Sequence, residues 1–99
     1  MILLIIISFN LVFNSLNYNT YIIAEIGINH EGNYSLCKEM VYSAKEAGVK
    51  AIKLQTIDAE KNYAKDTESY KIFNESKLSQ SETEKIFLLS KKLSLDIFT

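Results

Sequence analysis

Hydrophobic and polar positions along the chain follow two different periods. Short, almost continuous apolar runs occupy YIIAEIGI (21–28), KAIKLQT (50–56) and LDIFT (95–99). Runs of this length, rich in β-branched residues, predict strands buried in a sheet. Between them, apolar residues recur every three or four positions, which predicts helices. Strands that alternate with helices predict an α/β fold with parallel strands joined by crossovers.

Capping residues mark both ends of the first predicted helix and the start of the second. Asn33 is a suitable N-cap for the first helix, and Gly48 is a suitable residue to end it. Ser79 and Glu82 have the spacing of a capping box at the start of the second helix. The positions expected to face the core are Leu36, Met40, Ala44 and Ala47 in the first helix, and Ile86, Leu89 and Leu93, with Phe87 beside them, in the second.

The segment 57–78 connects the second strand to the second helix. It is polar and, at roughly 22 residues, long for a connection within a compact domain, which favours a functional loop. One helical turn is expected near YKIF (70–73).

Composition narrows the classes of function. The net charge is −1, all basic residues are Lys, and no dense basic cluster is present, so nucleic-acid binding has little support. The single Cys excludes an internal disulfide framework and a Cys-based zinc site, and Cys37 is expected to be a small core side chain. The single His cannot make a metal site alone.

Residues 1–19 form a separate, apolar N-terminal extension. The apolar run is too short for a membrane span, which needs about 20 residues. It resembles the apolar core of a signal peptide, but no Lys or Arg precedes it and no clear cleavage site follows. We therefore expect a cytoplasmic protein without membrane association, whose domain proper covers residues 20–99.

Three polar side chains stand out in the predicted strands. Because successive side chains of a strand point to opposite faces, Glu25 should lie on the face opposite Ala24 and Ile26. By the same alternation, Lys53 and Gln55 share one face of the second strand. These residues lie near the carboxyl ends of adjacent parallel strands, where α/β folds place their active sites.

Two interpretations of these residues are open. Burying a charge costs several kcal/mol unless it is paired, so an inward acid, amine and amide indicate a polar ligand site. The alternative is a structural ion pair between Glu25 and Lys53. The loop that follows the first strand has the same ambiguity. Asn29 and His30 either donate hydrogen bonds to a substrate or shape a turn whose glycines allow the bend.

At these residues the chain resembles a known family. AEIGINHEG (24–32) and AGVKAIKLQT (47–56) are recurrent signatures of the sialic acid synthases, which make N-acetylneuraminate, legionaminate and pseudaminate. LSQSETEKIFLLSKKLSLDIFT (78–99) also looks like this family, with Ser94 where a Gly is usual. The resemblance covers roughly residues 20–99 and implies about two and a half βα units, the N-terminal part of a (β/α)8 TIM barrel of about 250 residues.

The resemblance also implies an activity. It implies condensation of phosphoenolpyruvate with an N-acetylated amino sugar, which yields a nine-carbon 2-keto sugar acid and phosphate. Glu25 resembles the family's catalytic acid, Lys53 and Gln55 resemble substrate-binding residues, and Asn29 and His30 match the motif as residues that shape the loop or support the site. A divalent metal, Mn²⁺ or Mg²⁺, and a homodimer are implied for the full-length enzyme.

Parts of the family's machinery have no counterpart here. The metal-binding histidines of the family lie on later strands, so this chain supplies no metal ligand and is expected to be inactive alone. Two alternatives stay open: a truncated α/β module without enzymatic activity, and another phosphoenolpyruvate-dependent synthase of keto-sugar acids. Within the main interpretation, a related sugar-acid synthase for spore-coat polysaccharide is also possible.

Overall fold

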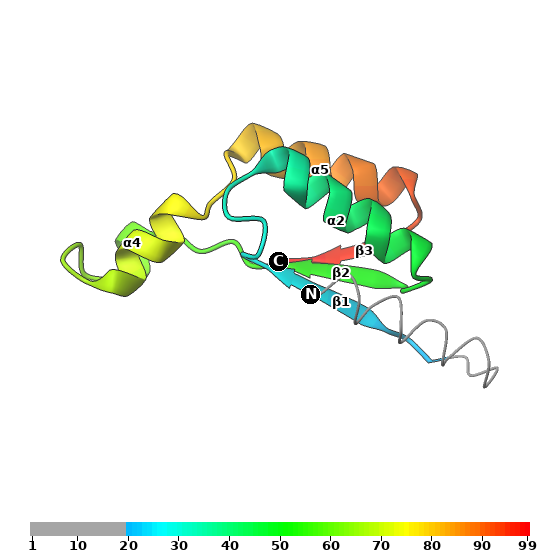
Figure 1. Cartoon of the computed structure of the whole chain (residues 1–99), viewed down its shortest axis with the longest axis horizontal. Coiled ribbons are helices and arrows are strands. Elements are labelled where there is room, and N and C mark those ends of the chain that lie inside the picture. The colour runs from blue at the N-terminus through cyan, green and yellow to red at the C-terminus, as the bar shows by residue number, and fades with distance from the viewer. Residues whose placement is uncertain (1–19) are drawn as a thin grey trace.

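The computed structural model describes residues 20–99, so the N-terminal extension predicted for residues 1–19 lies outside the described residues. One sheet contains three parallel strands in the order β1 (Ile23–Gly27), β2 (Ala51–Leu54) and β3 (Asp96–Phe98). Helices α2 (Tyr34–Glu46) and α5 (Gln80–Lys92) lie side by side over one face of the sheet (Figure 1). The predicted α/β fold is confirmed, and the arrangement is compatible with part of a barrel. The barrel itself stays a prediction.

The hydrophobic core lies between the sheet and these two helices. Ile26 and Ile52 are fully buried on the helix-covered face, and Ile86 of α5 meets them. Full burial of each such side chain stabilises the fold by about 1.5–3 kcal/mol. Of the predicted core positions, Met40, Ala44, Ala47 and Ile86 are buried, Leu36, Leu89 and Leu93 are partly buried against the core, and Phe87 is half-buried.

Both predicted N-caps are confirmed. The Asn33 side chain accepts a hydrogen bond from the Leu36 N–H (3.0 Å). At α5, the Glu82 N–H donates to Ser79 Oγ (3.1 Å) and the Ser79 N–H donates to Glu82 Oε2 (2.8 Å), which completes the capping box. Helix α2 ends at Glu46 with Ala47 as its C-cap, and Gly48 follows with a φ of +85°. Its N–H donates to the Lys45 carbonyl at 3.0 Å, so the prediction that Gly48 terminates this helix is confirmed.

The prediction for segment 57–78 was partly wrong. In place of a loop with one turn, it contains helix α3 (Ala59–Asn62) and the two-turn helix α4 (Glu68–Glu75). No side chain of α4 is buried, which explains why its sequence carries no strong core pattern. The Tyr63 and Phe73 rings stack with centroids 5.2 Å apart and connect the two helices. The segment extends beyond the sheet as an arm (Figure 1).

Ser94 occupies a backbone position that favours glycine. Its φ is +57°, and directly after α5 its N–H donates to the Lys91 carbonyl (3.1 Å). A side chain in this left-handed region costs about 1–2 kcal/mol. We expect Ser94→Gly to raise the free energy of unfolding by up to about 1 kcal/mol, because the greater freedom of Gly in the unfolded chain offsets part of the gain. Urea denaturation measures the change.

A serine inside a helix provides the matched control for this substitution. Ser43→Gly, within α2, should lower the free energy of unfolding by about 0.5–1 kcal/mol, because Gly is unfavourable in a helix interior. If Ser94→Gly also lowers the stability, the positive φ at Ser94 carries no strain that Gly relieves.

Candidate functional site at the strand ends

An acid and an amine meet on the face of the sheet that the helices leave uncovered. The register places Glu25 of β1 directly opposite Lys53 of β2. Glu25 Oε2 lies 3.6 Å from Lys53 Nζ, so the predicted shared face and pairing of these two residues are confirmed. The expectation that these two side chains are buried is wrong in the structure of residues 20–99, because 55% of the Glu25 side chain and 54% of the Lys53 side chain are exposed. A pair so exposed contributes little to stability.

A glycine lies at the centre of the polar side chains. The pairing of β1 with β2 shifts register between Glu25 and Gly27, and Gly27 has a φ of +58°. A Cβ on Gly27 would lie 3.5 Å from Glu25 Oε1, 3.6 Å from Asn29 Nδ2 and 3.8 Å from Gln55 Oε1. These three side chains therefore converge on the one position of the strand that carries no side chain. We call Glu25, Asn29, Lys53 and Gln55, arranged around Gly27, the strand-end cluster.

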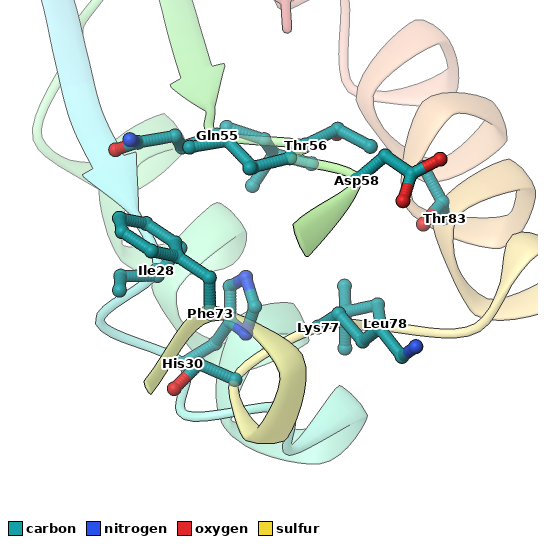
Figure 2. A pocket seen from close by; sticks show the side chains of 12 residues that line it. Ile28, His30, Gln55, Thr56, Asp58, Phe73, Lys77, Leu78 and Thr83 are labelled. Carbon is teal, nitrogen blue, oxygen red and sulfur yellow. The ribbon is translucent and has the colours of Figure 1, made fainter. Parts of the chain in front are cut away.

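Asn29 is fixed to the backbone of its own loop. Its Nδ2 donates to the Ile26 carbonyl at 2.7 Å, and its backbone N–H donates to the same oxygen at 3.1 Å. These two bonds close the turn that directly follows β1. Gln55, in contrast, is exposed, and its amide extends toward the end of β1 (Figure 2).

His30 is buried, with only 2% of its surface exposed. The Gly32 N–H donates to its Nδ1 at 3.0 Å. A ring nitrogen that accepts carries no proton, so the neutral ring holds its proton on Nε2. Burial lowers the pKa of His30 below its ordinary value, which favours this neutral form. The ring therefore acts at Nε2 as a hydrogen-bond donor without charge.

Cys37 has no part in this cluster. It is fully buried in α2, and burial raises the pKa of its thiol to about 11. A thiol with such a pKa stays protonated near neutral pH and is a poor nucleophile. The prediction that Cys37 is a core side chain is confirmed.

A cavity of about 170 Å³ lies beside the strand-end cluster. Gln55 belongs to both, since it lines the cavity and also approaches Gly27. His30 projects into the cavity from the loop after β1, and Phe73 and Leu78 approach from α4 and the segment after it (Figure 2). Thr83 of α5 lines the far side. We call this space the strand-end cavity.

Metal ligands are not gathered in the part of the chain that the structure describes. Among residues 20–99 no group of three or more His, Cys, Asp or Glu side chains is placed to hold a metal ion. The strand-end cluster offers only one carboxylate, and that carboxylate is paired with an ammonium group. These residues therefore do not fit a metal centre of their own.

Sequence reasoning missed several of these features. The central position of Gly27 requires the register shift in β1, which side-chain alternation does not reveal. The cavity wall formed by Phe73 and Leu78 comes from segment 57–78, which was expected to be mostly loop. The polar composition of that segment gave no signal for such a wall.

Comparisons with known proteins found similar sequences over short stretches of the chain. The N,N'-diacetyllegionaminic acid synthase of Legionella pneumophila is 55% identical over 40 residues, which are 40% of this chain and 11% of that protein. The N-acetylneuraminate-9-phosphate synthase of Drosophila melanogaster is 48% identical over 40 residues, again 40% and 11%. A spore coat polysaccharide biosynthesis protein of Bacillus subtilis is 43% identical over 51 residues, which are 52% of this chain and 14% of that protein. This chain carries a segment of the sialic acid synthase family.

The match to the sialic acid synthases is local. The chain spans only 11% to 14% of the length of these three relatives. No known protein-family profile matches the chain, and no solved structure matches it. The predicted relationship to the family is confirmed, whereas the reaction, the substrates and the roles of individual residues stay predictions.

The helices of the described region were also compared with the length of a membrane span. None of the helices within residues 20–99 is both long enough and apolar enough to cross a bilayer.

Proposed function

We propose that this segment contributes two strand ends to the active site of a sialic-acid-type synthase. The reaction would join carbon 3 of phosphoenolpyruvate to the aldehyde carbon of an open-chain, N-acetylated amino sugar. Water would add at carbon 2 and phosphate would leave, giving a nine-carbon 2-keto sugar acid. The proposal concerns a full-length synthase that carries this segment.

The observation that supports this proposal most strongly is the convergence at the strand ends. Glu25 and Lys53 lie 3.6 Å apart on the carboxyl-terminal side of parallel strands, and Glu25 and Gln55 both approach Gly27. Ligands of α/β folds bind at this end of the sheet. The pair is half-exposed and therefore contributes little to the stability of the fold. Its position is better explained by a role in binding a ligand than by a role in stabilising the fold.

Each side chain suits one need of the reaction. The ammonium group of Lys53 would bind a negative charge of phosphoenolpyruvate, and a charge-assisted hydrogen bond of this kind is about twice as strong as a neutral one. The carboxylate of Glu25 would position a reacting group or transfer a proton at the reacting centre. The Gln55 amide can donate and accept hydrogen bonds, which suits the orientation of a polar substrate.

The absence of a side chain on Gly27 fits the same role. Glu25 Oε1 and Gln55 Oε1 lie 3.5 and 3.8 Å from the place that a Cβ would fill. A substrate atom could therefore contact the backbone there while both side chains remain beside it. The divalent metal expected for the full-length enzyme would need ligands from other parts of the protein, so none of these roles depends on it.

The binding role of Lys53 is testable with a neutral replacement. We expect Lys53→Met, in a full-length synthase carrying this segment, to weaken the binding of phosphoenolpyruvate by about 10- to 100-fold, because one charge-assisted hydrogen bond is lost. Isothermal titration calorimetry with phosphoenolpyruvate measures the dissociation constant. Lys50→Met, an exposed lysine just before β2, is the matched control and should bind as the wild type does. Equal binding by the wild type and Lys53→Met would refute the proposed role.

A further inference from the structure

The loop after β1 has a backbone conformation that side chains disfavour. Glu31 has a φ of +54° and Gly32 a φ of +75°, so two consecutive residues lie in the left-handed region. Backbone hydrogen bonds run from the Glu31 N–H to the Ile28 carbonyl (2.9 Å) and from the Asn33 N–H to the His30 carbonyl (2.8 Å). The Gly32 N–H instead donates to a side-chain atom, His30 Nδ1, at 3.0 Å. The bond that holds Gly32 therefore depends on a titratable ring.

Gly32 is also the place where the arm closely approaches this loop. A Cβ on Gly32 would lie 2.8 Å from the Glu75 carbonyl oxygen and 3.2 Å from that of Lys77, so the end of α4 packs directly on the glycine. Helix α4 buries no side chain, and its position therefore depends on few contacts. The His30 ring projects into the strand-end cavity, which Phe73 of α4 also lines (Figure 2). The loop and the arm thus meet beside the His30 ring.

Protonation of His30 removes the acceptor that this arrangement needs. A charged imidazole carries a proton on each ring nitrogen and donates from both. In that state Nδ1–H and the Gly32 N–H would face each other as two donors, where the neutral ring has a hydrogen bond of 3.0 Å. The residue is only 2% exposed, and burial lowers the pKa of His30 below its ordinary value. Acid therefore opposes the native turn.

The charged groups that face the ring give its protonated form no net stabilisation. Asp58, from the segment after β2, lines the cavity and is paired with Lys61 at 3.3 Å. Lys77, from the segment after α4, lines the cavity with the opposite charge. Helix α5 contributes the uncharged Thr83. Helix α2, which begins just after the loop, has no acidic residue in its first turn, and Glu31 of the loop itself is exposed.

We propose that protonation of His30 releases the arm from the loop after β1. With a neutral ring, Nδ1 accepts the hydrogen bond from Gly32, and the turn fits the end of α4. With a charged ring, the turn leaves its left-handed conformation and α4 loses its contact with Gly32. The strand-end cavity then loses the wall that Phe73 and Leu78 provide, so acid opens the strand-end cluster on that side. This inference concerns the fold of residues 20–99 and does not depend on the proposed function.

The direction of the pKa shift gives the pH range of the release. The pKa of His30 lies below the ordinary value of 6.5 while the arm is bound, and returns toward that value when the turn opens. The bound arm is therefore fully favoured above pH 6.5, and this advantage is lost as the pH falls through the pKa of the bound state. Because one proton is taken up on release, the released fraction rises by at most about tenfold per pH unit.

Hydrogen exchange in the whole 99-residue chain, from about pH 7.5 to about pH 5, measures the release. After correction for the chemical exchange rate, the protection of the α4 amides should fall by up to about tenfold per pH unit below the ordinary pKa of histidine. The protection of the α2 amides should stay the same. His30 is the single histidine, so its ring gives one titration curve by NMR. The midpoint of that curve should coincide with the loss of protection in α4.

Two substitutions of His30 provide matched variants. His30→Asn places an acceptor that does not titrate near the position of Nδ1, so the protection of α4 should stay high across the pH range. His30→Gln places its amide near Nε2 and leaves the Gly32 N–H without an acceptor, so protection should be low at every pH. Constant protection of α4 in the wild type while His30 titrates would overturn the proposal. The same pH dependence in His30→Asn as in the wild type would also overturn it.

Discussion

Glu25→Gln in a full-length synthase carrying this segment is expected to lower the turnover number by about 10²- to 10⁴-fold, the usual contribution of a general acid or base. The amide has nearly the same size and can still donate and accept hydrogen bonds. It can neither take up a proton nor balance the charge of Lys53, whose Nζ lies 3.6 Å from the native carboxylate. Steady-state kinetics with phosphoenolpyruvate and an N-acetylated amino sugar measures the loss.

The same substitution should leave the fold intact. Because 55% of the Glu25 side chain is exposed, its ion pair gives the native state little stability. Thermal unfolding followed by circular dichroism should therefore be nearly the same for the wild type and Glu25→Gln. Glu39→Gln, an exposed carboxylate on α2, is the matched control and should retain normal turnover. Wild-type turnover in Glu25→Gln would mean that Glu25 and Lys53 are only a structural pair.

Gly32→Ala is expected to lower the free energy of unfolding by about 3 kcal/mol. Gly32 has a φ of +75°, where a side chain costs about 1–2 kcal/mol. A Cβ would also lie 2.8 Å from the Glu75 carbonyl oxygen and 3.2 Å from that of Lys77. Overpacking against backbone adds about 1–3 kcal/mol, because backbone cannot turn aside as a flexible side chain does. Urea denaturation measures the loss.

Gly27→Ala is the matched control, because it introduces the same side chain at a similar φ without the clash. The φ of Gly27 is +58°, and the nearest atoms would lie at ordinary contact distances of 3.5 Å or more. The expected loss is about 1–2 kcal/mol. Hydrogen exchange adds a local readout, since Gly32→Ala should accelerate exchange in α4 and Gly27→Ala should not. Equal losses of stability and equal exchange in α4 would contradict the proposed contact between Gly32 and the end of α4.

The sequence was sufficient to predict the faces of the sheet. The two-residue period of a strand separates Glu25 from Ile26, and that of the next strand separates Lys53 from Ile52. Alternation alone does not say which residues are opposite each other, because the hydrogen-bond register fixes that. The pairing of Glu25 with Lys53 was expected from their similar places near the strand ends, and the register confirms it. The helix caps were also predictable, because Asn33 and the Ser79–Glu82 box act through local hydrogen bonds.

The arm and the cavity were not predictable in the same way. Helix α4 buries no side chain, so hydrophobic periodicity carries little information about it. It meets the rest of the chain through the close approach of Gly32 to the backbone at its end. The burial of His30 likewise depends on contacts with distant parts of the chain. A lone histidine in a glycine-containing loop therefore left its binding and structural interpretations open, and only the tertiary structure reveals the state of its two nitrogens.

The strand order has a consequence for synthesis on the ribosome. Every strand in the described sheet pairs with the strand made immediately before or after it. The first two strands and α2 can therefore assemble as soon as they emerge, without waiting for a distant partner. Translation at about 5–20 residues per second then needs several seconds to reach β3. Until α5 arrives with Ile86, the apolar surface that this residue covers is open to water, and nascent chains have that interval in which to bind a chaperone or one another.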